Sequence, residues 1–331
     1  MRRILIVATL FAFVGWPENP SLRLSAAGQA APGATAAAAA GAWSEKARLL
    51  DLRSEVASAF VNGKVYVMGG LARNQEASTL NQEYDPATDI WRDRRPMPFP
   101  LSHPNAAVLN GRIYVVGGFL AQVHVAAQDS AFEYDPVTDA WKILAPLKTP
   151  RGSVGVAAVN GKIHAIGGRT VDRVTSAVHE IYDPATNTWA IGAPLPKARD
   201  HFATAVANGR IHVIGGRFNL PVDHTNMHDI YDPTTNTWSS GPPLPTSRGG
   251  GAAAFYKGMI VVAGGECRDF KPFDETEGYD VATGRWRTLA RMPIGKHGIT
   301  GTTDGQVMYI AGGNPECGLA MSSRMVTFTL P

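Results

Sequence analysis

The chain contains six short apolar runs, and each run ends at a Gly-Gly pair. Residues 64–68 (KVYVM) and 162–166 (KIHAI) are typical of these runs, which have the length and the apolar content of a buried strand. The Gly-Gly pairs follow one another at a nearly constant step, beginning at Gly69, Gly117, Gly167, Gly215, Gly264 and Gly312. A period near fifty residues predicts a repeat architecture of the β-propeller type.

Each repeat carries the marks of four strands, which we call a to d from the axis outward. A strand rich in Ala, Ser, Thr and Gly precedes the apolar run, and a two-residue turn such as Asn62-Gly63 joins the two as a tight hairpin. Small side chains are expected where six blades converge on one axis. Strand c is marked by Tyr84, Tyr134, Tyr182, Tyr231 and Tyr279, and strand d by Trp91, Trp141, Trp189, Trp238 and Trp286.

Trp43 indicates how the ring closes. It stands as far before Gly69 as Trp91 stands before Gly117, in register with the later Trp residues, yet no strands a to c precede it. The sixth repeat has strands a and b and a strand c over 322–330, but no strand d. We therefore predict an all-β, six-bladed propeller over residues 43–331, with the last blade closed by the N-terminal strand.

The order and spacing of Gly-Gly, Tyr-Asp-Pro and Trp resemble the Kelch motif over residues 43–331. Membership of the Kelch-repeat family implies the six-bladed propeller but no single function, because Kelch propellers share a fold across unrelated activities. All the length variation between the markers falls between strands b and c. These b–c loops share one face of the disc with the d–a loops, and variable loops on a rigid scaffold usually carry recognition.

Cationic residues are concentrated on this loop face. One fixed offset before each Gly-Gly pair, at the mouth of strand a, is cationic in five of the six repeats: Arg53, Arg151, Arg199, Arg248 and Lys296. Arg169 and Arg217 directly follow a Gly-Gly pair on the same face. Guanidinium groups bind carboxylates through two N–H donors, so these residues predict a binding face for a carboxylate. The alternative is that they pair with Asp or Glu between blades and serve the scaffold.

Three of the nine His residues are expected at the same mouth. His103, His201 and His297 come from blades two, four and six, and we count them among the ligand-binding residues. A metal site is the alternative use of this trio, although the mouth is expected to be too wide for three imidazoles to reach one ion at about 2 Å.

Other His residues are expected to be structural. His164 and His212 stand in strand b, where other blades carry a Tyr, and are predicted to pack inside their blades. His224 and His228 flank strand c of blade four and are predicted to lie at its edge or surface.

Glu266 departs from the repeat. It follows Gly264-Gly265 at a position where the other units carry Arg, Asn or an apolar residue. Gly265-Glu266 and Arg199-Asp200 resemble pairs in the bacterial N-acetylneuraminate epimerase family, whose members are secreted six-bladed Kelch propellers. That resemblance implies that Glu266 is the catalytic base. The alternative is a structural salt bridge from Glu266 to Arg248 or Arg217.

The first 42 residues differ from the repeats. Residues 1–27 combine Arg2-Arg3, an apolar run from Ile4 to Trp16 and a small-residue segment, the pattern of a secretory signal peptide. Residues 28–42 are Ala- and Gly-rich and read as a flexible lead-in. The run is too short to span a bilayer as a helix, although an uncleaved signal anchor remains the alternative. We therefore expect a periplasmic or secreted protein.

The two Cys residues, Cys267 and Cys317, lie in the b–c loops of adjacent blades. In an oxidising compartment such a pair is expected to form a disulfide, provided that the Cα atoms come within about 7 Å. Two separate thiols are the alternative. A zinc site is disfavoured, because no His stands near them at ligand spacing.

Charge and motifs narrow the function further. Removal of residues 1–27 takes away three positive charges and one negative charge, so the net charge falls from +3 to +1, which does not suit a nucleic-acid-binding domain. No polybasic run or amphipathic helix indicates a membrane surface, and no copper constellation or phosphate loop is present. We expect a monomer without cofactor or bound metal.

Two functions are compatible with these observations. The first is a secreted propeller that binds an anionic small molecule or protein segment, either an acidic sugar or an acidic peptide, on its loop face. The alternative is a sugar-acid mutarotase or epimerase with Glu266 as base.

Overall fold

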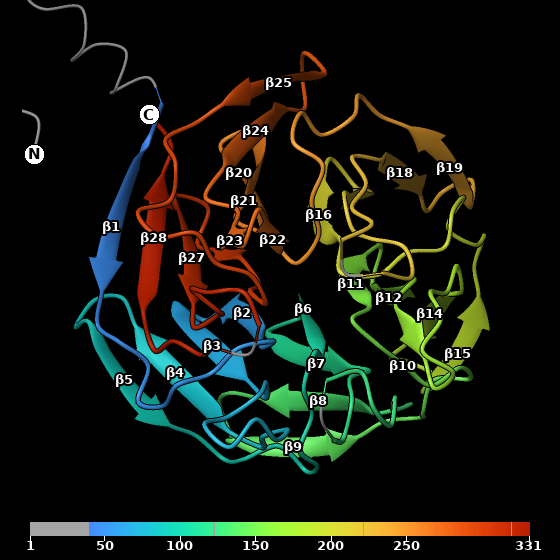
Figure 1. Ribbon diagram of the computed structural model, residues 1–331. Helices are drawn as coiled ribbons and strands as arrows, with labels where there is room; N and C mark the ends of the chain where they lie inside the picture. The colour runs from blue at the N-terminus through green and yellow to red at the C-terminus, as the bar shows by residue number, and fades with distance from the viewer. Residues whose placement is uncertain (1–39, 122, 221, 319) are drawn as a thin grey trace, which may run out of the picture.

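The computed structural model describes residues 40–121, 123–220, 222–318 and 320–331. Six four-stranded antiparallel sheets surround a central axis as blades (Figure 1). Within the described ranges the regular secondary structure is all strand. The predicted all-β, six-bladed propeller is thus confirmed. The predicted signal peptide (1–27) and most of the predicted lead-in (28–42) lie outside the described residues.

Blades one to five run in chain order from strand a to strand d. Blade one comprises β2 (Ala57–Val61), β3 (Lys64–Met68), β4 (Asn81–Asp85) and β5 (Ile90–Asp93). Blade two comprises β6 (Asn105–Leu109), β7 (Arg112–Val116), β8 (Ala131–Asp135) and β9 (Ala140–Ile143). Blade three comprises β11 (Gly155–Val159), β12 (Lys162–Ile166), β14 (His179–Asp183) and β15 (Thr188–Ile191). Blade four comprises β16 (Ala203–Ala207), β17 (Arg210–Ile214), β18 (His228–Asp232) and β19 (Thr237–Ser240). Blade five comprises β20 (Ala252–Tyr256), β21 (Met259–Ala263), β24 (Thr276–Asp280) and β25 (Arg285–Thr288).

Blade six combines the two ends of the described chain. Its strand order is β26 (Thr302–Thr303), β27 (Val307–Ala311), β28 (Met325–Thr329) and β1 (Ala42–Lys46). Strand c is shorter than the predicted 322–330, because Ser322 instead forms an isolated bridge to Arg53. Two short ribbons lie in the loops: β10 (Arg151–Gly152) with β13 (Arg169–Thr170), and β22 (Cys267–Arg268) with β23 (Lys271–Pro272).

The a–b hairpins turn as their sequences require. Asn62 and Gly63 have φ angles of +51° and +76°, and this turn sets the register in which Ala57 faces Met68. Both residue types accept positive φ at low cost, which is why Asn-Gly recurs between strands a and b. The same register in every blade brings each Gly-Gly pair to the loop face.

The hydrophobic core lies between neighbouring blades rather than in one central mass. One cluster, for example, joins Tyr66 and Met68 of blade one to Ile113, Val115 and Tyr134 of blade two. Because each blade packs on the next, the ring is stable only when every blade, including the sixth, has a partner on both sides. No helix in the described part of the chain has the length and apolar character needed to cross a bilayer.

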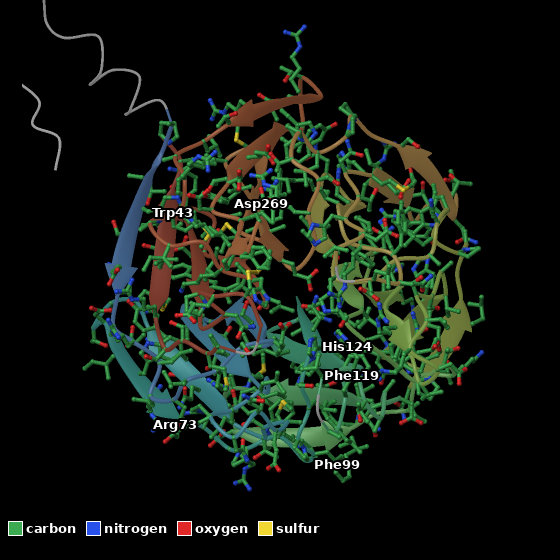
Figure 2. All side chains as sticks on the ribbon, in the orientation of Figure 1. Trp43, Arg73, Phe99, Phe119, His124 and Asp269 are labelled. Carbon is green, nitrogen blue, oxygen red and sulfur yellow. A yellow bond between two sulfur atoms is a disulfide. The ribbon has the colours of Figure 1, made fainter. Side chains whose placement is uncertain are left out.

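Trp43 confirms the predicted closure. It pairs with Phe328 across β1 and β28, with ring centroids 4.8 Å apart, and its indole N–H donates to the Ala290 carbonyl of blade five at 2.7 Å. The other marker Trp residues donate in the same way to the preceding blade; Trp91, for example, donates to Ala47 at 2.8 Å. Figure 1 shows β1 along the outer side of β28, and Figure 2 places Trp43 near the rim of the disc. The N-terminal strand therefore closes the ring through the contacts that join every other pair of blades.

Candidate functional site

Six equivalent positions form a ring at the axis. Each stands at the same offset before its Gly-Gly pair, directly ahead of strand a, and has a left-handed φ between +53° and +68°; they are Glu55, His103, Ser153, His201, Gly250 and Gly298. Backbone N–H groups join neighbouring members, as from His103 to the Glu55 carbonyl at 2.9 Å and from Gly298 to the Gly250 carbonyl at 3.1 Å. All six line the central channel. The fold thus presents six side-chain positions at one point, whichever residues occupy them.

Above this ring lies a hollow between the b–c loops, which we call the mouth pocket. It is lined by Glu55, His103, His124, His201, Arg217, Glu266, His297 and the two Cys residues. The sulfur atoms of Cys267 and Cys317 are bonded, with their Cα atoms 5.8 Å apart. The predicted disulfide is confirmed, and it ties the loops of blades five and six together beside the pocket.

Five of the predicted ligand-binding cations belong to the scaffold. At most 2% of the surface of each is exposed, and each reaches across its own blade to the carbonyl of the first Gly of its Gly-Gly pair; they are Arg53, Arg151, Arg199, Arg248 and Lys296. Three also form buried ion pairs: Arg151 with Glu180, Arg199 with Asp229 and Arg248 with Glu277. We therefore correct the expectation that these five line the binding face, because fully buried groups cannot touch a ligand.

Asp200 organises the remaining two arginines. Its carboxylate accepts from Arg169 Nε at 2.8 Å and from Arg217 Nε at 2.9 Å, and it lies 2.6 Å from His201 Nδ1. The other guanidinium nitrogens of Arg169 donate to the carbonyls of Arg173, Phe218 and Asn219, so none is left free for a ligand. Of the seven predicted cations, Arg217 alone lines the mouth pocket.

Glu266 is the anionic group of the pocket. It accepts from Arg217 Nη1 at 2.5 Å, and its carboxylate lies 3.4 Å from His224 Nε2 and 4.0 Å from His201 Nε2. Burial alone would raise the pKa of Glu266, but the surrounding donors, above all the permanently charged guanidinium of Arg217, outweigh burial and hold the pKa at about 2. The carboxylate is therefore ionised at neutral pH. The predicted salt bridge to Arg217 exists, and it lies within the pocket.

Glu55 is a second carboxyl group that sequence reasoning did not select. It lies 3.3 Å from His103 Nε2 and 3.8 Å from His297 Nδ1, and its Oε1 accepts from Asn314 at 3.4 Å. Burial, followed by the negative charge of Glu266, raises the pKa of Glu55 to about 8, although Arg217 offsets part of this rise. Glu55 is thus mostly protonated at pH 7. The sequence does hold a clue to Glu55, because it stands at the same distance before its Gly-Gly pair as His103 and His201 stand before theirs.

The structure assembles a different His trio from the predicted one. The ring nitrogens of His103, His124 and His201 lie within 4.8 Å of one another, whereas His297 turns to Glu55 and to the Glu316 carbonyl, 3.2 Å from its Nε2. His124 lies on the b–c loop of blade two, close to the centre of the disc in Figure 2. Arg217 Nη2 lies 3.2 Å from His124 Nε2 and 3.3 Å from His201 Nε2. A guanidinium at this point disfavours a metal ion between the imidazoles.

The other His residues divide between core and pocket. His164 Nδ1 lies 2.9 Å from His179 Nε2, and His212 Nδ1 lies 2.9 Å from His228 Nε2, so both predicted core residues pack inside their blades as buried pairs. The prediction of a surface position is wrong for His228, which is 2% exposed. His224 is half-buried, with its Nε2 3.4 Å from Glu266.

Four buried polar atoms at the mouth make no hydrogen bond of good geometry to the described residues: Glu266 Oε2, His224 Nε2, His297 Nδ1 and Asn314 Oδ1, the first two facing each other at 3.4 Å. Buried polar groups are nearly always paired, so a cluster of unpaired ones indicates a site that a ligand or water completes. The four atoms come from blades four to six, and this side of the mouth is therefore the candidate binding site.

Comparisons with known proteins agree with the fold. The family model of the KLHDC2/KLHL20/DRC7 Kelch-repeats domain matches residues 148–313, and that of the Kelch motif matches residues 52–98 and 100–148. No curated protein is similar enough in sequence to count as a relative. A solved structure, titled "Structure of YjhT", is similar with a TM-score of 0.71 and 17% sequence identity, covering 85% of this chain and 98% of that chain. At this level of identity the likeness shows the fold alone.

Proposed function

This chain belongs to the Kelch-repeat family of β-propellers, and we propose that it binds an acidic sugar in its mouth pocket. The observation that carries the proposal is the cluster of unpaired atoms in Glu266, His224, His297 and Asn314. It offers carboxylate and amide oxygens as acceptors, and imidazole nitrogens that accept or donate according to tautomer. A sugar hydroxyl both donates and accepts, so neighbouring hydroxyls on one ring can satisfy such a mixed set.

Arg217 supplies the preference for an acid. Among the described residues its Nη2 group is directed at His124 and His201, whose rings are neutral because burial, together with nearby charges, lowers their pKa values. A carboxylate is a stronger acceptor for a guanidinium than a neutral imidazole. An incoming carboxylate can therefore replace the two imidazoles as the acceptor of Nη2. An acidic peptide remains the competing ligand class, and it is an outcome of the test below.

We expect Arg217→Lys to reduce the preference for an acid. Lysine keeps the positive charge between Asp200 and Glu266 but loses the fork that holds a carboxylate. A hydrogen bond to a charged group contributes about 1.5–3 kcal/mol, so the wild type should bind glucuronate at least about tenfold more tightly than glucuronamide, and the variant should lose most of this ratio. Isothermal titration calorimetry measures both affinities.

Arg169→Lys is the matched control, because it changes the other guanidinium on Asp200 without changing a pocket-lining residue. Equal affinity of the wild type for the acid and the amide would overturn the proposed anchor. Binding of an acidic peptide with no binding of glucuronate or N-acetylneuraminate would overturn the sugar.

An exported location is part of the proposal. The Cys267–Cys317 disulfide supports an oxidising compartment, since such bonds rarely persist in the cytosol. The signal-peptide pattern of residues 1–27 agrees with it. Mass determination of the N-terminus of the protein recovered from the medium or periplasm tests this location.

A second candidate function is interconversion of the anomers of a sugar acid, with Glu266 as base. It is favoured by one observation: Glu266 is ionised, and among the residues described its Oε2 has only a long 3.4 Å contact with His224 Nε2. A carboxylate in this state can accept the proton of an anomeric hydroxyl. We expect Glu266→Gln to lose about 10²–10⁴-fold of the catalysed exchange, the usual contribution of a general base, and to bind the sugar acid still.

Exchange spectroscopy by NMR on N-acetylneuraminate measures the exchange rate. Glu76→Gln, an exposed residue in the b–c loop of blade one, is the control that should keep the full rate. An exchange no faster than the spontaneous one in the wild type, with N-acetylneuraminate shown to bind, would remove this second function and leave the binding proposal standing.

A further inference from the structure

Two glutamate side chains fill the space beside the two glycines of the axial ring, Gly250 and Gly298. A Cβ at Gly250 would collide with the side chain of Glu266, and a Cβ at Gly298 would collide with the carboxyl group of Glu55. Gly298 donates its backbone N–H to the Gly250 carbonyl at 3.1 Å, so the two positions are direct neighbours. The missing side chains leave room for both carboxyl groups over adjacent positions beside the channel.

The two carboxyl groups face different partners. Glu266 contacts a guanidinium, that of Arg217, and also His224 and His201. Glu55 contacts His103, His297 and Asn314, none of which carries a permanent charge. Arg217 and Glu266 act on Glu55 through their charges, and neither forms an ion pair or hydrogen bond with it among the described residues. One carboxyl group is therefore stabilised as an anion, whereas the other is not.

From this placement we propose that Glu55 is the proton donor that works with Glu266, so that the site opens and closes the ring of a reducing sugar acid. This inference rests on the second candidate function. Glu266 takes the proton of the anomeric hydroxyl as the bond between the anomeric carbon and the ring oxygen breaks. The electron pair of that bond passes to the ring oxygen, which receives the proton of Glu55, and a carbonyl forms. Ring closure on the other face of the carbonyl returns both protons.

The substrate class follows from this balance. The first step needs a free anomeric hydroxyl, so a glycoside, in which that oxygen carries a second carbon, binds without reacting. No oxidant, reductant or metal is required. The pKa values of about 8 for Glu55 and about 2 for Glu266 agree with the two roles, because opposed pKa values in one pocket mark an acid and a base.

The test is the catalysed anomer exchange of N-acetylneuraminate, by NMR, in the wild type and in Glu55→Gln, with calorimetry on the same samples. We expect Glu55→Gln to bind the sugar and to lose about 10²–10⁴-fold of the exchange, as general-acid groups usually contribute. In the wild type, the catalysed rate should fall above pH 8, where Glu55 loses its proton. In Glu55→Gln the remaining rate should not decrease above pH 8.

A backbone variant gives an independent measurement. Gly298→Ala places a methyl group against the Glu55 carboxyl and should lower the exchange at least tenfold. Gly209→Ala is the matched control, because Gly209 also has a positive φ, +73°, but its added Cβ meets nothing within 4 Å. Gly209→Ala should keep the full rate.

The outcomes separate the proposals. A full exchange rate in Glu55→Gln, with the rate lost in Glu266→Gln, would overturn the role of Glu55 and keep that of Glu266. Absence of exchange in a wild type that binds the sugar would overturn the catalytic proposals together. Absence of binding would overturn the proposed ligand itself.

Discussion

Removal of β1 is expected to open the propeller. A chain that begins after Lys46 loses Trp43, its contact with Phe328 and its hydrogen bond to Ala290, and leaves β28 as an unpaired edge. Trp43 is half-buried, so its loss alone should cost somewhat less than the about 3–5 kcal/mol typical of a fully buried Trp, and the loss of the paired strand adds to this cost. The melting temperature should therefore fall by about 10 °C or more. Thermal unfolding followed by circular dichroism measures it.

The control is a chain that begins at residue 40, which keeps the whole of β1. Its melting temperature should equal that of the full-length protein. Equal melting temperatures for the two truncated chains would contradict the closure by the N-terminal strand, whereas Trp43→Ala alone should reproduce a large part of the loss.

The second large effect is expected for Arg151→Met. Arg151 and Glu180 form an ion pair 3.1 Å long in which neither side chain is exposed, so the substitution leaves a carboxylate buried without its counter-charge. Breaking such a pair typically costs about 3–5 kcal/mol. Urea unfolding should show this loss in the free energy of unfolding, while the affinity of the folded variant for glucuronate should stay unchanged.

Arg112→Met is the matched control from the neighbouring blade. Arg112 pairs with Asp135 at 2.8 Å on the surface, where 43% of its side chain is exposed, and such pairs contribute about 0–1 kcal/mol. If Arg151→Met instead kept its stability and lost the sugar, Arg151 would belong to the binding face after all.

The fold could be predicted because each marker acts locally. Asn-Gly defines a hairpin, the apolar run defines strand b, and Trp43 falls in register with the later Trp residues even though its blade lies at the other end of the chain. The disulfide could be predicted for the same reason, since the repeat places Cys267 and Cys317 on loops of adjacent blades.

The site could be predicted only in part, because the repeat marks scaffold and pocket alike. Five cations at one offset suggested a binding face, yet their regularity reflects a contact that every one of them makes with its own Gly-Gly carbonyl. Glu55 was overlooked because its environment comes from blades two and six, far away in sequence. His124 lies in the b–c loop of blade two, and the b–c loops differ in length and sequence from repeat to repeat, so no period could place it at the centre.

The axial ring also bears on how such a molecule changes its chemistry over time. Backbone hydrogen bonds join neighbouring members at five of the six junctions of this ring, and Glu, His, Ser and Gly occupy the same left-handed backbone geometry in it. A mutation at one position alters what the axis presents without altering how the blades pack. Duplicated repeats of this kind can diverge one residue at a time toward new ligands while the shape of the protein stays constant. The two glycines add to that freedom, because a position without a side chain leaves space at the axis for another residue, Glu266 of the same blade at Gly250 and Glu55 of the next blade at Gly298.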